Sequence, residues 1–128
     1  MTAATKKILV ADDDPDILRI VTILLAKQGL EVITAEDGEE ALEKSLTEKP
    51  DAILLDINMP KLDGLRLLAK IKAESSLAHI PVGFLTVHED LEAYRQAQEL
   101  GAHVYLMKPF TPARLITFVG LLLGGGDG

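Results

Sequence analysis

Short runs of aliphatic and β-branched residues alternate along the chain with longer segments in which apolar residues recur every three or four positions. A short apolar run predicts a buried strand, whereas apolar residues at i, i+3, i+4 and i+7 predict a helix with one core-facing side. The chain shows five such pairs, each a strand followed by a helix. The strands are expected at residues 8–10, 31–34, 52–55, 81–85 and 103–107, and the apolar sets of the helices begin at Ile17, Ala41, Leu65, Leu91 and Leu115.

Polar residues mark where several of these helices begin. Asp37 with Glu40 three positions later resembles a capping box, in which two side chains satisfy the backbone amides of the first turn. Thr111 followed by proline is typical of an N-cap and a first helical position. Asp63 is expected to cap the third helix, and Asp14 is expected to act only as the cap of the first. The first helix is expected to face the core through Ile17, Ile20, Val21, Leu24 and Leu25.

Strands that alternate with helices predict an α/β domain with a doubly wound, five-stranded parallel sheet and helices on both faces, joined by right-handed crossovers. In open sheets of this kind, ligands bind beyond the carboxyl ends of the strands, where the strand order reverses. Functional residues are therefore expected in the segments that follow the strands.

Length and composition agree with a single compact unit. The chain has 128 residues, of which 48% are hydrophobic and 26% are charged. One domain is expected, over residues 1–123, followed by a glycine-rich tail or linker at residues 124–128. The chain contains no cysteine, which excludes disulfides, thiolate metal sites and cysteine nucleophiles.

The net charge of the chain argues against one class of partner, nucleic acids. The 13 basic and 20 acidic residues give a formal net charge of −7. A surface this acidic repels phosphate backbones, so we expect no direct nucleic-acid binding by this chain. The longest apolar run, Leu115–Leu123, is too short to span a bilayer, and residues 1–7 lack the apolar region of a signal peptide. We therefore expect a cytoplasmic protein without membrane contact.

Charged and hydroxyl side chains follow four of the predicted strands. Asp12 and Asp13 follow the first strand, Asp56 follows the third, and Thr86 and Lys108 follow the fourth and fifth. If the first strand lies beside the third, three carboxylates converge, and a hard divalent cation such as Mg²⁺ relieves their repulsion. The histidines lack the spacing of metal ligands: His79, His88 and His103.

Asp56 is the expected nucleophile of this group, because it ends the most buried of the strands and opens a loop. A carboxylate held beside a cation suits phosphoryl transfer through an aspartyl phosphate. The cation and the Lys108 ammonium would neutralise the phosphoryl oxygens, and the Thr86 hydroxyl would donate a hydrogen bond to one of them.

Four segments together resemble the receiver domains of response regulators in bacterial two-component signalling. They are Ile8–Asp13, Leu54–Pro60 with Asp63-Gly64, Leu85-Thr86 and Lys108–Phe110. Each segment is weak by itself, but their order and separations match the family over nearly the whole chain. The resemblance implies a flavodoxin-like sheet with strand order 2-1-3-4-5.

The resemblance also implies a phosphoacceptor and a metal site. Asp56 would receive a phosphoryl group from the phosphohistidine of a sensor histidine kinase or a phosphotransfer protein. Asp12, Asp13 and Asp56, together with the backbone carbonyl of Asn58, would bind Mg²⁺, with Mn²⁺ as a second candidate. The domain would then catalyse only its own phosphorylation and dephosphorylation, and would not be an enzyme that turns over a metabolite.

The remaining roles implied by the resemblance concern the response to phosphorylation. Lys108 would contact the phosphoryl group, and Thr86 with Tyr105 would form a switch pair. The output face would be the fourth helix, the fifth strand and the fifth helix, where a downstream output domain, a target protein or a second copy of the chain would bind. Both a lone receiver and the regulatory half of a longer protein fit this pattern.

Four positions depart from the common family pattern. Val87 stands where a small residue is usual, so access to the acceptor is expected to be narrower. Gly83 replaces a bulky aliphatic residue and is expected to weaken the fourth strand. Asn58 and His88 occupy positions that tune the lifetime of the phosphoryl group, as does Val87.

Two other functions compete with this interpretation. The first is a Mg²⁺-dependent phosphatase with an aspartate nucleophile, but such enzymes carry a second aspartate two residues later, where this chain has Asn58. The second is a binding module that works without phosphorylation, which would be expected to lack one of the strand-end residues. A nucleotide-binding protein is disfavoured, because no glycine-rich turn follows any strand.

Overall fold

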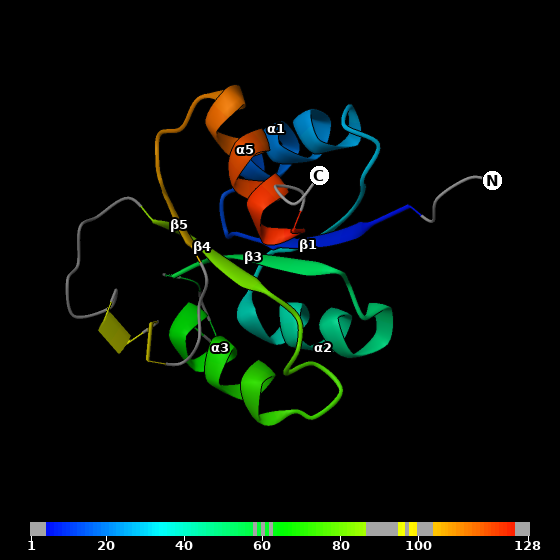
Figure 1. The fold of residues 1–128 in the computed structure, drawn as a ribbon. Coiled ribbons are helices and arrows are strands. Elements are labelled where there is room, and N and C mark those ends of the chain that lie inside the picture. Colours follow the sequence, from blue (N-terminus) through cyan, green and yellow to red (C-terminus); the bar gives the residue numbers. More distant parts are fainter. Residues whose placement is uncertain are drawn as a thin grey trace.

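The computed structural model describes residues 5–57, 59, 61, 63–86, 95–96, 98–99 and 104–124. Its strands form one five-stranded parallel sheet in the order β2-β1-β3-β4-β5 (Figure 1). This arrangement confirms the predicted fold class and strand order. The strands are β1 (Lys7–Ala11), β2 (Glu31–Ala35), β3 (Ala52–Asp56), β4 (Val82–Thr86) and β5 (Val104–Met107).

Helices cover both faces of the sheet. Figure 1 shows α1 and α5 on one face and α2 and α3 on the other. The apolar core is divided accordingly, because successive side chains of a strand point to opposite faces. Along β3, Leu54 packs toward α1 and α5, whereas Ile53 and Leu55 pack toward α2 and α3. The helices are α1 (Pro15–Ala26), α2 (Gly38–Glu48), α3 (Gly64–Ala73) and α5 (Pro112–Leu122).

The predicted helix starts agree with the structure. Asp14, Asp37, Asp63 and Thr111 are the N-caps of α1, α2, α3 and α5, and each side chain accepts a hydrogen bond from a backbone amide of the first turn. The predicted helix that begins near Leu91 lies largely outside the described residues.

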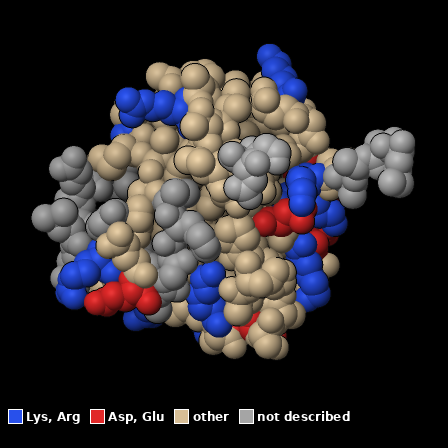
Figure 2. Space-filling view, in the orientation of Figure 1, with Lys and Arg blue, Asp and Glu red and all other residues tan. Residues whose placement is uncertain are grey.

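The core-facing side of α1 differs from the prediction at two positions. Ile20 is 49% exposed, while Leu18, which the predicted stripe omitted, is buried together with Val21 and Leu25. Most of this helix is apolar, so two overlapping stripes fit the helical period, and packing against the sheet decides between them. Ile20 and Ile23 are both exposed on α1. In Figure 2, most of the surface drawn above the sheet is tan rather than charged.

Gly83 has a packing role that the sequence did not reveal. It is buried in β4 and paired on both sides, with Leu54 of β3 and Val104 of β5. A Cβ atom at this position would lie 2.8 Å from Cζ of Phe118 and 3.0 Å from Cδ1 of Leu122. The side chains of α5 therefore occupy the space that a larger residue in β4 would fill.

The first turn of α2 is held by two acidic side chains. Asp37 Oδ1 accepts a hydrogen bond of 2.8 Å from the Glu40 amide, and Glu40 Oε1 accepts one of 2.7 Å from the Glu36 amide. The pKa of Glu40 is lowered, first by this Glu36 amide and then by the Lys44 ammonium. Asp37 also pairs with Lys61, which lies in the loop after β3, at 3.6 Å.

Glu40→Gln is expected to destabilise the protein at neutral pH by less than about 1 kcal/mol, because the carboxylate is partly exposed and screened by solvent. Since folding lowers the pKa of Glu40, its charge stabilises the protein above the ordinary value of 4.5, and this contribution is lost as the pH falls through the lower folded value. Urea unfolding at pH 7 and pH 3 measures the change, with Glu43→Gln as the matched control on the same helix. If the difference in the free energy of unfolding between Glu40→Gln and the parent grew toward pH 3, this expectation would be contradicted.

Candidate functional site

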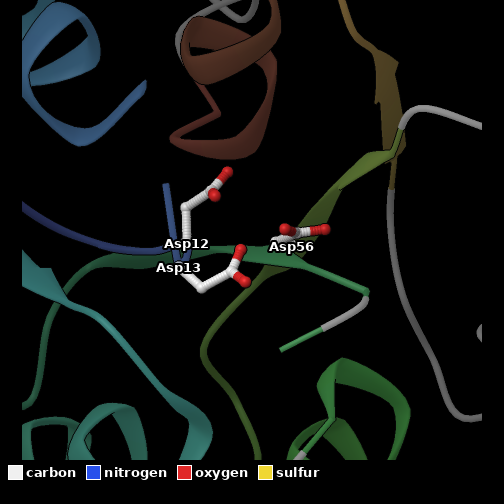
Figure 3. Close-up of side chains that lie close together, drawn as sticks. All are labelled: Asp12, Asp13 and Asp56. Atoms are coloured by element: carbon white, nitrogen blue, oxygen red, sulfur yellow. The ribbon is translucent and has the colours of Figure 1, made fainter. Parts of the chain in front are cut away.

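The three predicted carboxylates meet at the carboxyl ends of two neighbouring strands. Asp12 and Asp13 directly follow β1, and Asp56 ends β3; the register Ala11↔Leu55 brings these ends together. A carboxylate oxygen from each residue lies within 4.8 Å of one from each of the others. Figure 3 shows the three side chains close together. Asp12 is fully buried and Asp56 is 8% exposed, whereas Asp13 is exposed.

Local hydrogen bonds fix the start of the β1–α1 loop. The Asp12 amide donates to the Ala35 carbonyl of β2 at 3.1 Å, which continues the sheet pairing beyond the strand. Asp12 Oδ1 accepts a hydrogen bond of 2.9 Å from the Asp14 amide, and Asp14 in turn caps α1. The buried carboxylate is thus oriented by the turn that begins the helix, and the prediction that Asp14 is a cap is confirmed.

Lys108, just after β5, brings a positive charge to the carboxylates. Its Nζ donates a hydrogen bond of 2.6 Å to Asp12 Oδ2 and lies 3.5 Å from Asp56 Oδ2. Burial by itself lowers the pKa of the ammonium, but the hydrogen bond and charge of Asp12, together with the charge of Asp56, outweigh it and raise the pKa. Lys108 is therefore charged at neutral pH and bridges the two buried aspartates.

The charge of the cluster suits a hard cation. Three carboxylates and one ammonium carry a formal charge of −2, and two of the carboxylates are buried. Mg²⁺ binds oxygen ligands, commonly one or two carboxylates plus waters, and the exposed Asp13 leaves one side of the cluster open to solvent. The donor set among the described residues fits Mg²⁺, while Asn58, the fourth predicted ligand, lies outside those residues.

The predicted switch residues lie on the adjacent strands. Thr86 ends β4, one residue after Leu85, which pairs with Asp56 of β3, and the backbone of Thr86 pairs with Met107 of β5. Tyr105 is half-buried on the α2–α3 side of the sheet. Its ring stacks on Phe84 with ring centroids 6.1 Å apart and planes inclined by 20°. The predicted lifetime-tuning residues Val87 and His88, like Asn58, lie outside the described residues.

Phe84 is a neighbour of the site that sequence analysis missed. It is fully buried in β4, and it contacts the region of Gly64 as well as the ring of Tyr105. Its position near the end of the predicted fourth strand was the available signal, since ligands of such sheets bind at the strand ends. An apolar residue in a strand is, however, ordinary core, so this signal alone did not set Phe84 apart.

The sequence of the chain is similar to those of known proteins. A family model described as "Response regulator receiver domain" matches residues 8–120. Among curated proteins, the chain is 41% identical over 118 residues to the alkaline phosphatase synthesis transcriptional regulatory protein PhoP of Bacillus subtilis, covering 92% of this chain and 48% of that protein. It is 41% identical over 117 residues to the transcriptional regulatory protein PrrA of Mycobacterium tuberculosis, covering 91% and 49%. The chain thus spans about half the length of these relatives.

Solved structures agree with this similarity over the whole sheet. The chemotaxis protein CheY4 of Vibrio cholerae superposes with a TM-score of 0.89 at 33% sequence identity, covering 94% of this chain and all of that one. The receiver domain of NtrX from Brucella abortus superposes with a TM-score of 0.84 at 35% identity, covering 91% and 98%. Among the described residues, no helix has the length and apolar run that a membrane span requires.

Proposed function

Because the chain belongs to the response-regulator receiver domains of two-component systems, we propose that Asp56 is its phosphoacceptor and that the donor is the phosphohistidine of a sensor histidine kinase or phosphotransfer protein. A receiver domain is a signalling domain rather than a classical enzyme. The observation that carries the proposal is the position of the Asp56 carboxylate, 3.5 Å from the Lys108 ammonium and beside Asp12 and Asp13 at the end of the sheet.

The chemistry follows from the charges around Asp56. One carboxylate oxygen attacks the phosphorus atom, the P–N bond of the phosphohistidine breaks, and the imidazole nitrogen leaves with the electron pair. Lys108 neutralises a phosphoryl oxygen as charge spreads over these oxygens. Asp12, Asp13 and Asp56, with the carbonyl of Asn58, would hold Mg²⁺. When bound, Mg²⁺ supplies positive charge that lets an anionic donor approach three carboxylates.

Phosphorylation replaces the single negative charge of the Asp56 carboxylate with about −1.5 to −2 charges on the phosphoryl group and creates new acceptor oxygens. We propose that the Thr86 hydroxyl and the Tyr105 ring respond to this change and alter the face that contains β5 and α5. Val87, Asn58 and His88 are proposed to set how long the phosphoryl group persists. The similarity to transcriptional regulators about twice as long supports a downstream output domain as the partner of this face; a homodimer through the same face is the second candidate.

Domain limits and location are proposed on the same basis. Residues 1–123 would form the receiver domain, with residues 124–128 as a tail or linker, and the protein would act in the cytoplasm without contacting nucleic acid through this chain. The phosphatase alternative is less well supported, because Asn58 stands where that chemistry needs a second aspartate.

The test is the intact mass of the protein after incubation with acetyl phosphate in the presence of Mg²⁺ or of a chelator. One phosphoryl group is expected with Mg²⁺, and at least tenfold slower labelling is expected with the chelator, because the cluster then keeps its full negative charge. Fragmentation should locate the adduct on Asp56, and phosphate monoesters should not be turned over. No adduct from acetyl phosphate or from a phosphorylated histidine kinase would contradict the proposal.

A further inference from the structure

Resting on the proposed phosphoacceptor role of Asp56, we propose that Gly64 is a positioning residue for that carboxylate. Gly64 is the first residue of α3, seven residues after Ile57, and it touches the backbone at the end of β3. Its missing side chain lets the start of α3 lie directly against the peptide groups that carry Asp56. Residue 64 therefore has to lack a Cβ atom if Asp56 is to keep its position.

The contact involves main-chain atoms that have little freedom to move. A Cβ atom on Gly64 would lie 2.6 Å from the carbonyl oxygen of Asp56 and 2.8 Å from Cα of Ile57. It would also lie 3.0 Å from Cε1 of the buried Phe84 ring. Distances this short are not tolerated, so one of the backbone segments has to shift.

Hydrogen bonds hold the same backbone from two sides. The Gly64 amide donates to the Ile57 carbonyl at 2.7 Å, and the Ile57 amide donates to the Leu85 carbonyl of β4 at 3.3 Å. Asp63 caps α3 by accepting a hydrogen bond of 2.9 Å from the Arg66 amide, which fixes the direction in which the helix starts. The end of β3 is thus held between β4 and the first turn of α3.

The geometry explains why a shift would reach the carboxylate. Gly64 approaches Asp56 from the α2–α3 side, where Ile57 and Phe84 lie. Leu54, two residues before Asp56, packs on the opposite side, so the alternation of β3 directs the Asp56 side chain toward α1 and α5 and toward Lys108. Backbone pushed from one side therefore moves the carboxylate relative to Asp12 and Lys108 on the other.

Gly83 offers a matched comparison. A Cβ atom there would also meet close neighbours, at 2.8 Å and 3.0 Å, but these are the side-chain ends of Phe118 and Leu122. Gly83→Ala is thus expected to strain packing in the α1–α5 core without displacing the backbone of Asp56. A Cβ atom at Gly120 meets nothing within 4 Å, so Gly120→Ala is the control for an alanine that fits.

The experiment compares Gly64→Ala, Gly83→Ala, Gly120→Ala and the parent chain in melting temperature, Mg²⁺ affinity and the rate of labelling by saturating acetyl phosphate. Gly64→Ala is expected to weaken Mg²⁺ binding and to slow labelling of the folded protein by about tenfold or more, since small misplacements of a reacting group have large effects on rate. Gly83→Ala is expected to lower the melting temperature and yet label within about twofold of the parent rate.

Amide chemical shifts in the metal-free protein separate positioning from general damage. Gly64→Ala should change the amide signals of Asp56 and Ile57, and Gly83→Ala should leave them in place.

If Gly64→Ala does not fold, hydrogen exchange in the parent tests the contact instead. The Gly64 amide should exchange as slowly as the Ile57 amide, as expected if both belong to one cooperative unit. Fast exchange at Gly64, or a folded Gly64→Ala with parental Mg²⁺ affinity and labelling, overturns the proposal. If the parent itself is not labelled, the phosphoacceptor role fails, while the amide shifts and exchange still test the contact.

Discussion

No phosphoryl adduct is expected on a variant in which Asp56 is replaced by Asn. The substitution keeps the size of the side chain and its place at the end of β3, but an amide cannot attack phosphorus as a carboxylate does. The measurement is intact mass after incubation with acetyl phosphate and Mg²⁺, at times when the parent is fully labelled.

Asp63→Asn is the matched control for this variant. Asp63 lies in the same β3–α3 connection, and asparagine is also a good N-cap, so α3 should start as before. Asp63→Asn should be labelled like the parent. Equal labelling of Asp56→Asn and the parent would place the phosphoryl group on another residue.

Lys108→Met is expected to lower the free energy of unfolding of the metal-free protein by about 3 kcal/mol. Lys108 contacts both buried aspartates, and removing one partner of a buried ion pair is strongly destabilising. The raised pKa of Lys108 shows the same coupling from the side of the ammonium, as Asp12 and Asp56 outweigh its burial. Urea unfolding at neutral pH in a chelator measures the loss, and Mg²⁺ should restore part of it.

A double-mutant cycle with Asp12→Asn measures the interaction energy between Lys108 and Asp12. In the Asp12→Asn background, Lys108→Met should lower the free energy of unfolding clearly less than in the parent. The side chain at position 12, which accepts the 2.6 Å hydrogen bond from Lys108, is then neutral. An equal cost in both backgrounds would mean that Lys108 stabilises the protein through its aliphatic stem rather than through its charge.

Sequence analysis predicted the strands and the site for the same reason. Buried parallel strands are apolar on both faces, so an aspartate at the end of such a run stands out, as Asp56 does after residues 52–55. The rule that ligands bind at the carboxyl ends of strands then brought Asp12 and Lys108 to the same place. Lys108 and Asp12 are 96 positions apart in the sequence, so their contact could be expected only as part of that edge of the sheet.

The features that sequence analysis missed depend on packing between elements. Ile20 and Leu18 fit the apolar pattern of α1 about equally, and only the position of the helix on the sheet distinguishes them. Gly64 appeared as part of a motif, but the 2.6 Å approach to the Asp56 carbonyl is a property of how α3 starts against β3. In the sequence Phe84 is an ordinary core residue, and only the structure shows that its ring stacks on Tyr105.

Gly83 and Phe118 limit the routes by which this fold can change over generations. A side chain at Gly83 forces Phe118 and Leu122 to shift while Phe118 is large, and a smaller residue at Phe118 leaves a cavity while Gly83 has no side chain. Either single step is therefore costly, although exchanging both residues together would refill the same volume. Descendants of this sequence should tend to retain the glycine and the phenylalanine as a pair or to lose both, which makes the contact between β4 and α5 a historical constraint as well as a structural one.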